Sequence, residues 1–208
     1  MGELISLIDR RAARSQRADR ATPAFFFDVC CPFSYLAAER IERLLGAVEW
    51  IPASSVAVAD GGWQLSDTAQ FAAERRAAEL RLPLVWPDRS PLCVPGLLRA
   101  VSYATTIGGG AQFALAAMRL EFCGGFDLED PEILAEAAAA AGLPLEECFQ
   151  AIGDPALDAP LRANAQALRV RAVDRLPAVR VGSRLIDGEH RLGEAAALLR
   201  TPAAQSAG

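Results

Sequence analysis

The chain has 208 residues, of which 52% are hydrophobic and 23% are charged, and its formal net charge is −5. This composition is typical of a globular protein with enough apolar side chains to bury a substantial core. The negative charge disfavours nucleic acid as a partner, because a phosphate backbone is bound by clustered Lys and Arg side chains. No run approaches the roughly 18 apolar residues of a membrane helix, so we expect no membrane partner.

The cysteine pattern indicates a reducing compartment. The five cysteines are an odd number, and their spacings form no disulfide framework. Residues 1–24 are rich in arginine and have no long apolar core, which disfavours a secretion signal. We therefore expect a cytoplasmic protein. The single histidine, His190, belongs to no Cys/His cluster with metal-ligand spacing, so we expect no metal site.

The first part of the chain predicts a β-α-β unit. A weak amphipathic helix is expected over residues 4–20, and Thr22-Pro23 then breaks the chain. A short aromatic run predicts a buried strand over residues 24–28, and apolar side chains at helical spacing predict a helix over residues 33–45. A second strand is predicted over residues 48–52. This order favours a parallel pair of strands joined by a right-handed crossover.

The middle of the chain is predicted to be helical. Ser66 and Asp130 are expected to cap two of the helices, since their side chains can accept hydrogen bonds from free N–H groups of the first turn. Residues 82–95 are expected to form a proline-rich loop that holds Trp86 and Cys93. No strand pattern occurs between about Ser55 and Leu176. The expected helices cover residues 67–80, 96–107, 111–122, 131–141, 145–152 and 157–170.

Strand patterns return near the end of the chain. Residues 178–181 and 184–186 flank Gly182-Ser183, which is a two-residue turn signal for a hairpin. A final helix is expected over residues 191–200, and residues 201–208 are expected to be a flexible tail.

The element order predicts an α/β fold of the thioredoxin plan, β-α-β followed by β-β-α, with an all-helical domain inserted in the middle. We expect residues 24–54 and 171–200 to form the thioredoxin-like domain and residues 55–170 the helical insertion. Residues 1–23 are then an N-terminal extension.

Cys31 is the main candidate for chemistry, because it lies between the first strand and the helix that follows. Backbone N–H groups in the first turn of a helix are unpaired, and the helix dipole there favours negative charge. A thiol in this position is expected to have a lowered pKa and to react as its thiolate. The alternative is a small buried apolar residue. For the neighbouring Cys30, packing is the expected role.

Ser34 stands three positions after Cys31, where a redox dithiol would have its second cysteine. Its hydroxyl can donate a hydrogen bond to the Cys31 thiolate, or Ser34 can be an ordinary first-turn residue whose side chain bonds to the backbone. It cannot resolve a mixed disulfide, because that step needs a second thiol.

The sequence resembles the DsbA-like branch of the thioredoxin superfamily, and within it the 2-hydroxychromene-2-carboxylate isomerases and kappa-class glutathione transferases. The DsbA-like oxidoreductases have C-P-x-C at the helix start, whereas the isomerase and kappa-class groups have S-P-Y-S. This chain combines Cys31 of the first pattern with Ser34 of the second, and it has His190 where the isomerases usually have aspartate. The resemblance is carried by Phe26-Phe27-Asp28, Cys31-Pro32-Phe33-Ser34-Tyr35-Leu36-Ala37, Leu176-Pro177 ahead of Val179-Arg180-Val181-Gly182, and Gly188-Glu189-His190-Arg191-Leu192.

The resemblance implies several binding residues. It implies that Pro177 is cis and that Leu176 offers its backbone N–H and C=O to an extended, peptide-like thiol. Gly188, His190 and Arg191, at the start of the last helix, are candidates for holding a carboxylate of glutathione, unless they form an ordinary helix start. Trp86 is a weaker candidate for the rim of a substrate pocket, since aromatic residues at such spacing are more often core.

The resemblance also implies a thiol-dependent enzyme with Cys31 as its nucleophile. The first hypothesis is a thiol-disulfide oxidoreductase that acts through one cysteine. The alternatives are a glutathione-dependent cis/trans isomerase or glutathione transferase, and a thiol- or peptide-binding module without catalysis. The expected co-substrate is glutathione or another low-molecular-weight thiol, the partner is a small molecule or a peptide, and kappa-class relatives imply a possible homodimer.

Overall fold

The computed structural model describes residues 22–60, 65–87 and 94–200. The helix expected over residues 4–20, Cys93 and the tail at residues 201–208 lie outside these residues. Within them, the predicted α/β fold is confirmed: one four-stranded sheet is surrounded by helices.

The sheet has the strand order β2-β1-β3-β4. Its strands are β1 (Ala24–Phe27), β2 (Glu49–Pro52), β3 (Ala178–Val181) and β4 (Arg184–Asp187). β1 is parallel to β2, as the β-α-β pattern predicts, and antiparallel to β3. β3 and β4 form the predicted hairpin. Its turn needs Gly182, whose φ of +58° lies in the left-handed region that glycine adopts at least cost.

The central strand β1 is buried on both faces. Side chains alternate between the faces of a strand, so Phe25 and Phe27 enter the larger core cluster and Phe26 enters the smaller one. On the larger side, Trp50 of β2 packs edge-on against Phe25, with ring centroids 5.0 Å apart. This aromatic packing anchors β1, the strand that precedes the candidate cysteine Cys31.

The helix predicted over residues 33–45 is two helices, α2 (Pro32–Ala38) and α3 (Ile41–Leu45). The break lies at Arg40, whose backbone N–H donates to the carbonyl three residues back rather than four. The two side chains at the break both form tertiary ion pairs, Glu39 with Arg119 of a later helix and Arg40 with Glu189. The sequence pattern shows the apolar face of this segment but not these distant partners.

Helices fill the chain between β2 and β3, and the described residues there contain no strand. Ser66 and Asp130 cap their helices as predicted, each accepting a backbone N–H, from Ala69 at 3.2 Å and from Glu132 at 2.9 Å. The short helix α4 was not predicted. The helices are α4 (Ser55–Val58), α5 (Asp67–Leu80), α6 (Pro95–Thr106), α7 (Gly110–Phe122), α8 (Pro131–Ala140), α9 (Leu145–Gly153) and α10 (Asp158–Arg169), with a 3₁₀ turn at Pro155–Leu157.

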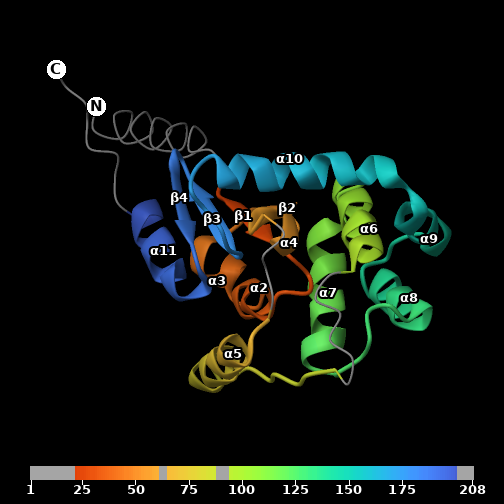
Figure 1. Ribbon diagram of the computed structural model, residues 1–208, viewed down its shortest axis with the longest axis horizontal. Coiled ribbons are helices and arrows are strands. Elements are labelled where there is room, and N and C mark those ends of the chain that lie inside the picture. The colour runs from red at the N-terminus through yellow and green to blue at the C-terminus, as the bar shows by residue number, and fades with distance from the viewer. Residues whose placement is uncertain (1–21, 61–64, 88–93, 201–208) are drawn as a thin grey trace, which may run out of the picture.

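Figure 1 shows helices α6 to α9 gathered beside the sheet, and α10 runs along both the sheet and this group of helices. Helix α5 lies away from the group, near α2. The last helix, α11 (Leu192–Arg200), follows a 3₁₀ turn at Glu189–Arg191 and packs on α3 and β3. The larger core cluster contains side chains of β1 and α2 together with side chains of α6 to α9. The inserted helices therefore share a core with the sheet, while the domain boundaries at residues 54 and 171 stay a prediction.

No helix in the described part of the chain combines the length and the apolar character needed to cross a membrane. Within the same residues, no three His, Cys, Asp or Glu side chains gather as they would around a metal ion.

Candidate functional site

Cys31 is the N-cap residue of α2, directly after the turn that leaves β1. Its backbone N–H donates to the carbonyl oxygen of Asp28 at 3.1 Å, which closes that turn. Its thiol donates to the carbonyl oxygen of Leu176 at 3.6 Å. The structure thus brings together the two halves of the site that the sequence predicts, although only 1% of the Cys31 surface is exposed.

The segment before β3 runs beside the thiol. The peptide bond between Leu176 and Pro177 is cis. The carbonyl oxygen of Pro177 accepts a hydrogen bond from the N–H of Gly188 at 2.8 Å, and this bond ties the segment to the start of the last helix. The backbone of Leu176 therefore has a fixed position next to Cys31.

A cavity of about 320 Å³ opens beside Cys31. Its lining is largely apolar, with one acidic and one basic side chain. This volume falls at the lower end of the range of small-molecule sites. The lining residues are Cys31, Phe33, Leu65, Ala69, Asp174, Arg175 and Leu176.

Ser34 is fully buried one turn into α2, and its oxygen accepts a hydrogen bond from the backbone N–H of Asp28 at 3.2 Å. A hydroxyl can donate one hydrogen bond while it accepts another, so the Ser34 hydroxyl proton remains available to a different acceptor. The hydroxyl and the backbone N–H of Ser34 both lower the pKa of Cys31, and so does the N–H of Phe33. The bond to the backbone is therefore present, while donation from the Ser34 hydroxyl to the Cys31 thiolate stays a prediction.

Burial nevertheless dominates the ionisation of Cys31 and raises its pKa to about 11. A thiolate loses most of its hydration in an apolar site, and this cost exceeds the help from the helix start and from Ser34. The negative charge of Asp28 raises the pKa further. The sequence-based expectation of a lowered pKa is therefore wrong for this conformation: the thiol is protonated at neutral pH.

Two buried carboxyl groups near the site were not recognised in the sequence. Asp28 accepts the N–H of Cys30 at 3.1 Å and that of Ser55 at 2.7 Å, while burial raises its pKa. Glu121 of α7 is 1% exposed and has one carboxyl oxygen with no partner in the described structure. Burial, and then the charge of Asp28, raise the pKa of Glu121 to about 9. A pKa of about 9 means that Glu121 is protonated at neutral pH.

These residues were missed because their sequence context is ordinary. An aspartate directly after a strand is typical of a turn, and this context does not indicate that the carboxyl group of Asp28 is buried. Glu121 lies on a helix where a glutamate is usually solvated. The only available signal was its place between two apolar residues, Leu120 and Phe122.

Gly188, His190 and Arg191 do not line the Cys31 cavity. The N–H of Gly188 is already bonded to Pro177, and His190 is exposed. The guanidinium of Arg191 bonds to Asp187 and Glu194 within its own segment. Their binding of a glutathione carboxylate stays a prediction, and the structure does not bring them to the cavity.

Glu189, in the middle of that motif, has a different partner set. Its carboxylate is 2% exposed and forms ion pairs with Arg40, after α2, and with Arg76 of α5, the latter at 2.7 Å. Glu189 therefore links the start of the last helix to two other segments, and no sequence feature pairs these three residues.

Trp86 also lies away from the Cys31 cavity. Its ring packs edge-on against Phe122 with centroids 6.3 Å apart, and its indole N–H donates to Glu74 at 2.7 Å. Trp86 is thus part of the packing between α5 and α7, which is the alternative that the sequence left open.

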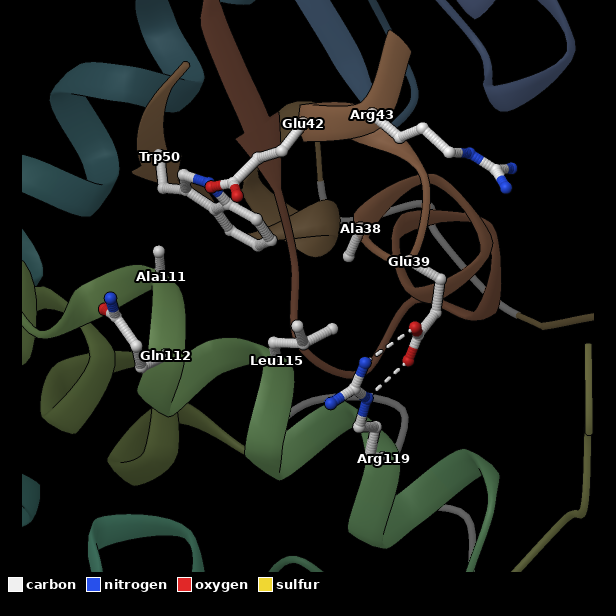
Figure 2. A pocket seen from close by; sticks show the side chains of 9 residues that line it. All are labelled: Ala38, Glu39, Glu42, Arg43, Trp50, Ala111, Gln112, Leu115 and Arg119. Carbon is white, nitrogen blue, oxygen red and sulfur yellow. Dashed lines mark hydrogen bonds and ion pairs between the residues drawn. The ribbon is translucent and has the colours of Figure 1, made fainter. Parts of the chain in front are cut away.

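A second cavity, of about 200 Å³, lies between α7 and the segment of α2 and α3. Figure 2 shows Trp50 facing α7 across it and Arg119 paired with Glu39 at one end. Among the described residues, those that line this second cavity include no cysteine, serine or histidine. It offers no nucleophile, so the Cys31 cavity is the candidate site for thiol chemistry.

The fold and this cysteine-bearing helix start define a thioredoxin-like protein with an inserted helical region. The model of the DSBA-like thioredoxin domain family matches residues 24–200, and the chain belongs to this family. No curated protein matches the sequence.

Several solved structures share the fold. A 2-hydroxychromene-2-carboxylate isomerase is 17% identical, with a TM-score of 0.74 over 86% of this chain and 94% of its own. A probable DsbA oxidoreductase from Streptomyces coelicolor is 22% identical, with a TM-score of 0.66 over 88% and 93% of the two chains. The cytosolic disulfide reductase DsbM from Pseudomonas aeruginosa, solved with GSH, is 15% identical, with a TM-score of 0.61 over 86% and 97%. At these identities the likeness shows the fold alone.

Proposed function

We propose that the protein is a thiol-disulfide oxidoreductase that reacts through the single cysteine Cys31, with glutathione or another small thiol as co-substrate. The observation that carries this proposal is the contact between the Cys31 thiol and the Leu176 carbonyl, at 3.6 Å beside a cavity of about 320 Å³. A peptide-like disulfide that pairs with the backbone of Leu176 would place one of its sulfurs next to Cys31.

In the proposed reaction, the Cys31 thiolate attacks one sulfur of a disulfide. A mixed disulfide with Cys31 forms, the original S–S bond breaks, and the second half leaves as a thiolate that takes up a proton. A glutathione thiolate then attacks the mixed disulfide and releases Cys31. Position 34, where a resolving cysteine would stand, is a serine. The small thiol therefore performs the resolving step.

The burial of Cys31 favours one alternative, a glutathione-dependent isomerase. A thiol with a pKa of about 11 is a hydrogen-bond donor at neutral pH, as the serine of the isomerase pattern is. It can hold the thiolate of a bound co-substrate, which itself adds to a conjugated double bond, permits rotation and leaves. Cys31 is then a binding residue and is never alkylated by the substrate.

One pair of variants separates these functions. Wild type, Cys31→Ser and Cys123→Ser are compared in the glutathione-dependent reduction of bis(2-hydroxyethyl) disulfide and in the isomerisation of a maleyl-type conjugated acid. Cys123 is the matched control because it is a partly exposed free thiol outside the cavity. Reductase activity lost in Cys31→Ser and kept in Cys123→Ser supports the exchange reaction.

The other outcomes count against that reaction. Isomerase activity that survives Cys31→Ser supports the alternative, since serine can replace a thiol as donor. If neither reaction occurs while calorimetry detects glutathione binding, the protein is a binding module, and the oxidoreductase proposal is wrong.

A further inference from the structure

The charged rim of the Cys31 cavity consists of Asp174 and Arg175, the two residues directly before Leu176. Their side chains are 74% and 66% exposed, whereas Cys31 and Leu176 at the inner end are almost fully buried. A ligand whose sulfur reaches Cys31 along Leu176 must therefore pass or stop beside both charges.

Asp174 and Arg175 both have side-chain polar atoms that can form further hydrogen bonds with a ligand. Arg175 meets Asp174 at 3.2 Å and Asp187 at 3.9 Å, in both cases through Nε. Its two terminal nitrogens make no hydrogen bond with the described residues. A guanidinium binds a carboxylate through two parallel hydrogen bonds, and the terminal nitrogens provide one such edge. Asp174 uses one oxygen for Arg175, which leaves the second for an ammonium group.

We propose that Asp174 and Arg175 select the thiol partner of Cys31, and that the preferred partner carries a carboxylate and an ammonium group on one carbon. The carboxylate pairs with Arg175 and the ammonium with Asp174, while the apolar lining accepts the methylene that leads to the sulfur. This inference rests on the proposed exchange reaction. The chemical step is that exchange: the bond to Cys31 forms, the disulfide of the partner breaks, and its second half leaves as a thiol.

The test uses a charge series of small symmetrical disulfides. The probes are cystine (zwitterionic), cystamine (cationic), 3,3′-dithiodipropionate (anionic) and bis(2-hydroxyethyl) disulfide (neutral). Second-order rates of adduct formation at Cys31, read by peptide mass spectrometry, are compared in wild type, Arg175→Gln and Asp174→Asn. Arg184→Gln is the matched control, because it removes the same charge from an exposed position on β4, outside the cavity.

Arg175→Gln is expected to slow the anionic and zwitterionic probes about three- to tenfold, as the loss of one exposed charge contact implies. Asp174→Asn should slow the cationic and zwitterionic probes and accelerate the anionic one. The neutral probe, and every probe with Arg184→Gln, should stay within about twofold of wild type. The differences should shrink at high salt, because exposed charges are screened.

Two failures are distinguishable. If wild-type Cys31 reacts with the probes, but Arg175→Gln and Arg184→Gln behave alike, the selection by charge is overturned and the exchange reaction stands. If no probe reacts at Cys31, the exchange reaction is overturned, and this inference with it.

Discussion

The thiol of Cys31 donates to the carbonyl oxygen of Leu176 across 3.6 Å, although the two residues are 145 positions apart in the chain. The contact depends on the thiol being protonated, because a thiolate would face the carbonyl oxygen without a proton between them. Reaction at Cys31 therefore needs both deprotonation and replacement of this contact by a substrate sulfur.

The pH dependence of Cys31 alkylation tests its electrostatic setting. Because burial raises the pKa of Cys31 to about 11, the thiolate fraction should still rise about tenfold per pH unit between pH ~7 and pH ~10. Iodoacetamide labelling, followed by peptide mass spectrometry, measures this profile. A plateau near neutral pH would contradict the account, because it would mean a pKa below that of an ordinary thiol.

Ser34→Ala should slow this labelling about tenfold near neutral pH. The hydroxyl of Ser34 lowers the pKa of Cys31, and a hydrogen bond to a charged group is worth about 1.5–3 kcal/mol. Ser183→Ala, in the exposed turn of the hairpin, is the control and should label at the wild-type rate. Equal rates for the two variants would mean that Ser34 does not contact the thiolate.

Asp28→Asn should have opposite effects on reactivity and stability. Removing the negative charge lowers the pKa of Cys31 and accelerates its alkylation. The amide cannot accept from both Cys30 and Ser55, so unfolding in urea should show a loss of about 1–3 kcal/mol. Asp130→Asn is the matched control, since Asn and Asp are equivalent helix caps. An unchanged alkylation rate in Asp28→Asn would exclude the charge effect.

The protonation of Glu121 predicts a pH dependence of stability. Its pKa is about 9 in the folded state and near the ordinary value of 4.5 in the unfolded chain. Between these values the folded state holds a proton that the unfolded state lacks, so the free energy of unfolding falls as the pH rises. The slope from this group is at most about 1.4 kcal/mol per pH unit.

Glu121→Gln should remove that part of the slope and stabilise the protein at pH ~8 relative to wild type. Urea unfolding at a series of pH values measures it, with the exposed Glu129→Gln as control. If Glu121→Gln and Glu129→Gln show the same slope, Glu121 is not protonated in the folded state.

Ser34→Cys tests why the protein needs an external thiol. The variant restores the C-P-x-C spacing one helical turn below Cys31, so a mixed disulfide at Cys31 can be resolved within the chain. Mass spectrometry should detect an internal disulfide after oxidation, where wild type retains an adduct. A stable adduct in Ser34→Cys would show that position 34 cannot reach the sulfur.

The sequence predicts the strands and most helices, because these depend on local apolar periodicity. The resemblance, through a motif order that spans the chain, assigns Cys31 and Leu176 to one site, although it does not predict the contact between them. The sequence could not predict the pKa of Cys31, since the dipole and Ser34 act within a few residues while the burial that outweighs them comes from distant segments. The same is true of Glu189, whose partners Arg40 and Arg76 are remote in the chain. Exposed rim charges such as Arg175 carry no local signal.

The measurement that tests the central claim most directly is incubation of the wild-type protein with oxidised glutathione, followed by mapping of the adduct. We predict a single glutathionyl group at Cys31, released by reduced glutathione and absent in Cys31→Ser. A protein left unmodified at Cys31, or modified at Cys123 alone, would contradict the account and would leave Cys31 as a buried binding or packing residue.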